Sequence, residues 1–200
     1  MTLFEYDSAV RNDFSVVCGI DEAGRGPLAG DVYAAAVIFD EDVFIDGLND
    51  SKKLTEKKRE KLFDEIISKA KAYCVATASV EEIEEINILQ ATFLAMKRAY
   101  EGLGIAADIA LIDGNQFPKL DCKMETVVKG DSLSASIAAA SILAKVSRDR
   151  YMTELAEKYP EYRFEKHKGY GTKLHKELIL EHGTCPVHRM SFLKKLLKNG

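Results

Sequence analysis

Residues 18–38 read CGIDEAGRGPLAGDVYAAAVI, and this stretch decides the fold that the rest of the chain completes. Apolar runs at residues 16–20 and 32–39 flank a segment that is rich in glycine and contains a proline. Short apolar runs bounded by turn-forming residues are typical of buried strands. The stretch therefore predicts two neighbouring strands, with the adjacent carboxylates Asp21 and Glu22 directly after the first.

Downstream of this stretch, helical and strand patterns alternate. Thr55 is a candidate helix cap, and Ser79 with Glu82 has the spacing of a capping box. Further strands are predicted at residues 73–78, 108–112 and 123–128, and helices at 55–71, 79–101, 131–159, 174–182 and 192–198. The order of two strands, helix, strand, helix, two strands and helix predicts an α/β domain with a mixed sheet.

Composition narrows the class of protein. The 200 residues are 46% hydrophobic and 30% charged, which suits a chain with a sizeable buried core. We expect no membrane span, because no apolar run approaches 18 residues. The N-terminus lacks the apolar block of a secretory signal, and the four cysteines are scattered. Both features predict a cytoplasmic protein with unpaired thiols.

The charge is unevenly distributed. The whole chain carries −4, but residues 163–200 hold nine lysines and arginines against three acidic residues. Because phosphate affinity depends on local basic patches, the negative total does not exclude nucleic acid. A solvated helical surface explains such a tail equally well.

Acidic residues recur where predicted strands end or helices begin. Asp21 and Glu22 follow the first strand, Asp113 follows the strand at residues 108–112, and Asp131 opens the long helix. Clustered carboxylates repel one another unless a cation neutralises them. Oxygen ligands favour Mg²⁺ or Mn²⁺, and two such ions about 4 Å apart would activate a water and stabilise a leaving oxygen in phosphoryl displacement.

Each of these features also has a plainer explanation. Asp113 before Gly114 is ordinary turn chemistry, and Asp131 could simply cap a helix. The segment from Gly24 to Gly26 does not continue as a dinucleotide-binding loop, because its spacing differs and Pro27 lacks an amide donor. The combination of these acidic sites favours a metal centre. The adjacent carboxylates Asp21 and Glu22 favour it as well, because helix capping does not explain their place after a strand.

Six blocks together carry a family resemblance. They are CGIDEAGRGPLAGDVYAAAVI (18–38), DSKKLTEKKRE (50–60), NILQATFLAMKRA (87–99), LIDGN (111–115), KGDSLSASIAAASILAKVSRDR (129–150) and HKGYGTKLH (167–175). The first and fifth are long and specific. In this order they closely resemble bacterial ribonuclease HII, the type 2 ribonuclease H.

The resemblance implies a ribonuclease H-like catalytic domain over residues 1–160 and a helical C-terminal extension over 161–200. It implies a metal-dependent endonuclease that cuts the RNA strand of RNA–DNA hybrids. Enzymes of this kind also cut 5′ of a single ribonucleotide in duplex DNA, leaving a 3′-hydroxyl and a 5′-phosphate, which suits ribonucleotide excision after DNA replication.

The resemblance also assigns roles to single residues. Asp21, Glu22, Asp113 and Asp131 match the catalytic, metal-binding carboxylates. Gly24, Arg25 and Gly26 match a loop that contacts the ribose 2′-hydroxyl, Tyr170 a tyrosine that packs on the next sugar, and Lys52 a position near substrate phosphates. Reading the 2′-hydroxyl is chemically sensible, because that group separates RNA from DNA.

Other basic and metal-ligand residues leave alternatives open. Lys145 and Arg148 could face a phosphate or form salt bridges. His182, Cys185 and His188 have two-residue gaps but no evident fourth ligand, so zinc is disfavoured. We expect a monomer whose final helix, residues 191–198, either contacts a replication protein or caps the domain.

Three rival functions are also compatible with these residues. A resolvase-like nuclease would cut DNA without preferring ribose. A hybrid-binding module would use its carboxylates only to maintain the fold. A dinucleotide-binding domain would be stabilised by a nicotinamide cofactor.

Overall fold

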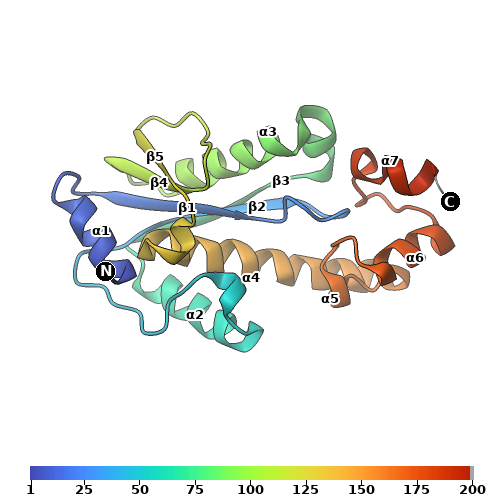
Figure 1. The fold of residues 1–200 in the computed structure, drawn as a ribbon, viewed down its shortest axis with the longest axis horizontal. Coiled ribbons are helices and arrows are strands. Elements are labelled where there is room, and N and C mark those ends of the chain that lie inside the picture. The colour runs from blue at the N-terminus through green and yellow to red at the C-terminus, as the bar shows by residue number, and fades with distance from the viewer. Residues whose placement is uncertain (199–200) are drawn as a thin grey trace.

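A mixed five-stranded sheet forms the centre of the computed structural model, which describes residues 1–198 (Figure 1). The strands are β1 (Val17–Ala23), β2 (Val32–Ile38), β3 (Ala72–Ala78), β4 (Ile109–Asp113) and β5 (Lys123–Val127). Their order in the sheet is β3-β2-β1-β4-β5. The β1–β2 and β2–β3 pairs are antiparallel, whereas β4 runs parallel to both β1 and β5. This arrangement confirms the predicted α/β class.

Helices cover both faces of the sheet. Figure 1 shows α3 (Val80–Glu101) on one face and α2 (Glu56–Lys69) with α4 (Ala135–Lys158) on the other. Successive side chains of a strand point to opposite faces. In β2, Ala34 and Ala36 pack in the core under α3, while Ala35 packs with α2 and α4. This burial on both faces explains why β2 is apolar at every position rather than at alternate ones.

The start of α4 lies very close to β1. A Cβ atom placed on Gly19 would be 2.1 Å from the carbonyl carbon of Ser136. Only glycine permits that approach, and the alanines and serines among residues 135–141 let the first turns of α4 lie near the sheet. Strand β1 and the start of α4 therefore pack backbone against backbone.

Several predicted helix ends are confirmed. Thr55 caps α2, and Ser79 with Glu82 forms the predicted capping box of α3. Helix α3 ends at Gly102 but bends at Asn87, which has φ 68° and whose side chain accepts hydrogen bonds from Leu89 N and Gln90 N. The N-terminal helix α1 (Leu3–Arg11) was not predicted.

Two predictions about the acidic residues were wrong in detail. Asp131 does not open α4: it lies in a separate 3-10 turn, η2 (Gly130–Ser132), and Ser134 is the helix cap. Asp21 and Glu22 lie inside β1 rather than after it. Strand β1 is longer than expected because its antiparallel pairing with β2 continues to Ala23.

The chain ends in short elements packed at the far end of α4 (Figure 1). They are η3 (Pro160–Tyr162), α5 (Phe164–His167), α6 (Lys173–His182) and α7 (Met190–Lys198). Their core contains Tyr162, Phe164, Ile179 and Leu193 together with Met152 of α4. Within residues 1–198, no helix combines the length and the apolar character that crossing a bilayer requires.

Candidate active site

Three aspartates from three separate elements meet beside the sheet. Asp21 lies in β1, Asp113 is the last residue of β4, and Asp131 lies in η2. Because β1 and β4 are parallel neighbours with Ile20 opposite Ile112, their following residues lie side by side. One oxygen from each aspartate lies within 4.8 Å of the others. Glu22, the fourth predicted carboxylate, is not part of this trio.

Local hydrogen bonds hold these carboxylates in place. Gly130 N donates to Oδ1 of Asp113 over 2.6 Å, which ties η2 to the end of β4. Glu22 N donates to Oδ1 of Asp21 over 2.7 Å. The carboxylate of Glu22 instead lies 3.3 Å from Nη1 of Arg25, at the mouth of the site.

The site concentrates negative charge in a partly buried place. Burial, and then the charges of Glu22 and Asp113, hold the pKa of Asp21 well above its ordinary value. Burial, with Asp113, also raises the pKa of Asp131. Its counter-ion Lys52 has Nζ 3.7 Å from Oδ2 of Asp131. One exposed lysine does not neutralise the negative charge of the three aspartates, so the site suits a divalent cation with oxygen ligands.

No second set of metal ligands competes with the aspartates in the described part of the chain. His188, in the segment that was considered for zinc, accepts a hydrogen bond from Cys185 N at Nδ1 and places Nε2 3.1 Å from Nε2 of His175. Both imidazoles are buried and hydrogen-bonded within the protein. They are therefore structural parts of the C-terminal region.

A groove beside the aspartates brings the other predicted site residues together. A hollow of about 210 Å³ is lined by Glu22, Gly24, Arg25, Gly26, Lys52, Lys145 and Tyr170, among others. These residues come from β1, the β1–β2 loop, the 3-10 turn η1 (Ser51–Lys53), α4 and the loop before α6. A Cβ on Gly26 would lie 3.9 Å from the Tyr170 ring, so the loop and the tyrosine face each other across the groove.

Arg189, which is not among the residues predicted from the sequence, holds the β1–β2 loop through its backbone carbonyls. This side chain is fully buried. Its guanidinium donates to the backbone carbonyls of Gly24, Arg25, Pro27 and Gly30 over 2.6–3.0 Å. The available signal, an arginine beside a predicted helix, is indistinguishable in sequence from the surface cations of the basic tail.

Arg148 fastens the same loop to the segment that carries Tyr170. It donates to the carbonyls of Ala29, Asp31 and Lys168 over 3.0–3.1 Å and is almost completely buried. For Arg148 the sequence left a phosphate contact and a salt bridge open, and the structure instead places its guanidinium on backbone carbonyls. Together, the two buried arginines determine how the loop and Tyr170 face each other.

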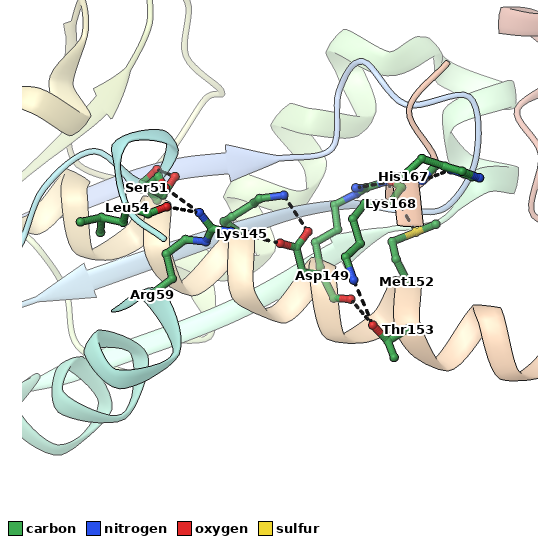
Figure 2. Close-up of polar contacts among 12 residues, drawn as sticks. Ser51, Leu54, Arg59, Lys145, Asp149, Met152, Thr153, His167 and Lys168 are labelled. Atoms are coloured by element: carbon green, nitrogen blue, oxygen red, sulfur yellow. Dashed lines mark hydrogen bonds and ion pairs between the residues drawn. The ribbon is translucent and has the colours of Figure 1, made fainter. Parts of the chain in front are cut away.

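A polar network along α4 positions the turn that carries Lys52. Figure 2 shows Arg59 donating to the carbonyls of Ser51 and Leu54 and lying near Asp149, which also pairs with Lys145. The Lys145–Asp149 distance is 2.7 Å, in line with the salt-bridge alternative for Lys145. The Ser51 hydroxyl lies 2.9 Å from that of Ser141, whose side chain also hydrogen-bonds to Asp21.

Comparisons with known sequences and with solved structures give relatives that agree with one another. A sequence model of the family described as Ribonuclease HII matches residues 18–195. A Ribonuclease HII from Caldicellulosiruptor saccharolyticus is 56% identical over 192 residues, covering 96% of this chain and 94% of the relative. The crystal structure of ribonuclease H2 from Pyrococcus horikoshii has a TM-score of 0.76 at 28% identity and covers 92% of this chain and 98% of that chain.

A third relative was solved with a partner. The structure of the PCNA:RNase HII complex from Archaeoglobus fulgidus gives a TM-score of 0.69 at 27% identity. The match covers 88% of this chain and 94% of that one. These likenesses show that the mixed sheet and its helices have a ribonuclease H-type fold.

Proposed function

The chain belongs to the ribonuclease HII family, and on that basis we propose that it is an endonuclease that hydrolyses the RNA strand of RNA–DNA hybrids. The observation that carries the proposal is the meeting of Asp21, Asp113 and Asp131 within 4.8 Å. It fits the divalent-metal dependence of this family of hydrolases.

The metal centre is proposed to consist of the three aspartates with Glu22 at its edge. When bound, Mg²⁺ or Mn²⁺, with two ions in the reacting complex, would activate the attacking water and neutralise charge on the phosphate. The carboxylates would hold the ions, and Lys52, which is 78% exposed and lies beside Asp131, is placed to contact a substrate phosphate.

The groove is proposed to read the sugar. Backbone groups of Gly24, Arg25 and Gly26 would face the ribose 2′-hydroxyl, which DNA lacks. Arg189 keeps this loop rigid by binding its carbonyls, so its position is set before substrate arrives. A rigid loop is the natural way to distinguish two sugars that differ by one hydroxyl.

Tyr170 is proposed to pack on the neighbouring sugar, where a deoxyribose is accepted. Its ring is partly exposed at the groove and lies 5.9 Å from the Arg148 guanidinium. With one ribose and one deoxyribose in place, water attacks phosphorus 5′ of the ribonucleotide and the bond to the preceding 3′ oxygen breaks. The products are a 3′-hydroxyl and a 5′-phosphate.

The proposal also covers the oligomeric state, the domains and a protein partner. We propose a monomer with a catalytic domain at residues 1–160 and an extension at 161–200, of which residues 199 and 200 lie outside the described structure. A replication-protein contact through residues 191–198 is supported by the exposed side chain of Leu197 and by the partner solved with the Archaeoglobus relative.

The proposal is tested with a labelled DNA duplex that contains one ribonucleotide, incubated with Mg²⁺, Mn²⁺ or EDTA. We expect metal-dependent cutting 5′ of the ribonucleotide and an intact all-DNA control. Equal cutting of both duplexes would indicate a resolvase-like nuclease. Binding without cutting under either metal would indicate a hybrid-binding module, and stabilisation by a nicotinamide cofactor alone would indicate a dinucleotide-binding domain.

A further inference from the structure

A buried acid on the N-terminal helix contacts the start of α4. Asp7 of α1 is only 1% exposed. Its Oδ2 accepts hydrogen bonds from the backbone N–H of Ser136, over 2.8 Å, and from the Ser136 hydroxyl, over 2.6 Å. Its Oδ1 has no hydrogen-bond partner within residues 1–198. The hydrogen bonds of this carboxylate therefore all go to the first turn of α4.

That first turn needs an outside acceptor. The first backbone N–H groups of a helix have no partner inside it. The cap residue Ser134 accepts from Ile137 N, which leaves the N–H of Ser136, a fully buried residue. Asp7 supplies the missing acceptor from 129 residues away in the sequence.

The same turn controls the spacing of the aspartates. On one side it leads directly to η2, because Ser134 N donates to Gly130 O over 2.8 Å, and η2 carries Asp131. On the other side, Ser136 is pressed against Gly19, two residues before Asp21 in β1. A shift of Ser136 would therefore move Asp131 relative to Asp21.

We propose that Asp7 is a positioning residue for the metal site: by holding the first turn of α4, it sets the distance between Asp21 and Asp131. This inference rests on the proposed function, because it treats the aspartates as metal ligands. Helix α1 lies outside the residues matched to the family, 18–195, and contributes none of the three aspartates.

The test measures Mn²⁺ affinity by titration calorimetry on the full chain without nucleic acid. Residues hydrogen-bonded directly to metal ligands typically change affinity by about 10–100-fold, and Asp7 acts through Ser136, so we expect Asp7→Ala to weaken Mn²⁺ binding by about tenfold, the low end of that range. Asp7→Asn retains an acceptor oxygen and should recover part of the loss. Ser8→Ala, at an exposed position of the same helix, is the matched control and should bind as the original protein does.

Cleavage kinetics give a second readout. We expect kcat to fall in Asp7→Ala while KM for a ribonucleotide-containing duplex stays the same, because the groove itself is untouched. A variant with a lower Tm but unchanged Mn²⁺ affinity and kcat, measured where circular dichroism shows it folded, would reduce Asp7 to a stabilising residue and overturn the proposal.

Two further measurements separate a failure of this inference from a failure of folding or of the proposed metal site. If Asp7→Ala does not fold, Ser136→Ala, which removes one of the two donors, should still weaken Mn²⁺ binding, and unchanged binding there would refute the inference. If the unmodified protein itself fails to bind Mn²⁺, the metal assignment falls, and this failure is distinguishable from one specific to Asp7.

Discussion

At Asp113, a single carboxylate links the sheet to the turn that follows β5. Oδ1 accepts from Gly130 N, and the same side chain belongs to the group of three aspartates. Its position at the end of β4 was predicted from sequence, but its contact with Gly130 was not. This contact favours asparagine as the test substitution, because its amide oxygen can still accept the hydrogen bond from Gly130 N.

We expect Asp113→Asn to abolish cleavage and leave the fold intact. The amide keeps an acceptor for Gly130 N but removes a negative charge from the site, so kcat should fall by at least about a hundredfold while substrate binding stays equal or tightens. Single-turnover cleavage and fluorescence anisotropy measure the two effects. Asp121→Asn, at an exposed position, is the control. Normal cutting by Asp113→Asn would remove this residue from the metal site.

Tyr170 is expected to matter most where one ribonucleotide stands alone. Aromatic packing on nucleotides is worth on the order of 1–3 kcal/mol, so Tyr170→Ala should lower kcat/KM on a single-ribonucleotide duplex by at least about fivefold. Tyr170→Phe preserves the ring and should retain most activity. Identical kinetics for the alanine variant, with an unchanged Tm, would contradict the packing role.

At the scale of elements, the β1–β2 loop is the part whose conformation is decided from elsewhere. Gly24 and Gly30 have positive φ of 98° and 84°, which favours glycine. The loop carbonyls point inward to Arg189 and Arg148, which come from the region before α7 and from α4. The loop is thus shaped by side chains more than 100 residues away.

Replacing Arg189 should damage both stability and sugar selection. Lysine keeps the charge but lacks the planar fork of donors. Arg189→Lys leaves several buried carbonyls without partners, so we expect a loss of at least about 2 kcal/mol in the free energy of unfolding. Cutting of the single-ribonucleotide duplex should fall more than metal binding does. Arg163→Lys, at an exposed position, is the control, and equal effects from both substitutions would reject the loop-holding role.

At the scale of the whole molecule, the C-terminal elements are joined by buried histidines. Cys185 N donates to Nδ1 of His188, so Nε2–H of His188 donates to Nε2 of His175. His175 in turn donates from Nδ1 to the carbonyl of Tyr170 over 3.0 Å. This chain of hydrogen bonds requires both rings to be neutral, and the ring of His167 stacks on His175 at 4.2 Å.

The histidines predict a loss of stability in mild acid. Burial lowers the pKa of His175 and of His188 from 6.5 to about 4. Between those values the unfolded chain binds protons that the native rings do not, so stability falls as pH drops from about 6.5 towards 4. Because the two rings are hydrogen-bonded to each other, they titrate as a pair and their contributions to this slope are not independent.

Urea unfolding at a series of pH values measures this slope. His188→Gln should flatten it, because one buried titrating group is removed, although the variant starts from lower stability. His182→Gln changes a partly exposed ring and serves as the control. A slope in His188→Gln equal to that of the unmodified protein between pH 6.5 and 4 would show that this buried ring does not titrate as inferred.

Sequence alone determined the α/β class, most element ends and the candidate acidic residues of this protein. Apolar runs, helical periodicity and capping residues such as Ser79 act over a few residues, so they can be read in order along the chain. The motif blocks added the family and, through it, the groove residues from Gly24 to Tyr170. Each of these features lies within a short stretch of the chain, either as a pattern of a few residues or as a short sequence motif.

Tertiary structure alone decided which residues support the site. The burial of Arg189 and Arg148 and the contact of Asp7 with Ser136 each join segments more than 100 residues apart. The turn that holds Asp131 apart from α4 depends on the Gly130–Asp113 contact, which forms because β5 lies beside β4. The physical reason is that a buried charge looks like a surface charge in sequence, and only close packing of distant segments supplies its partners.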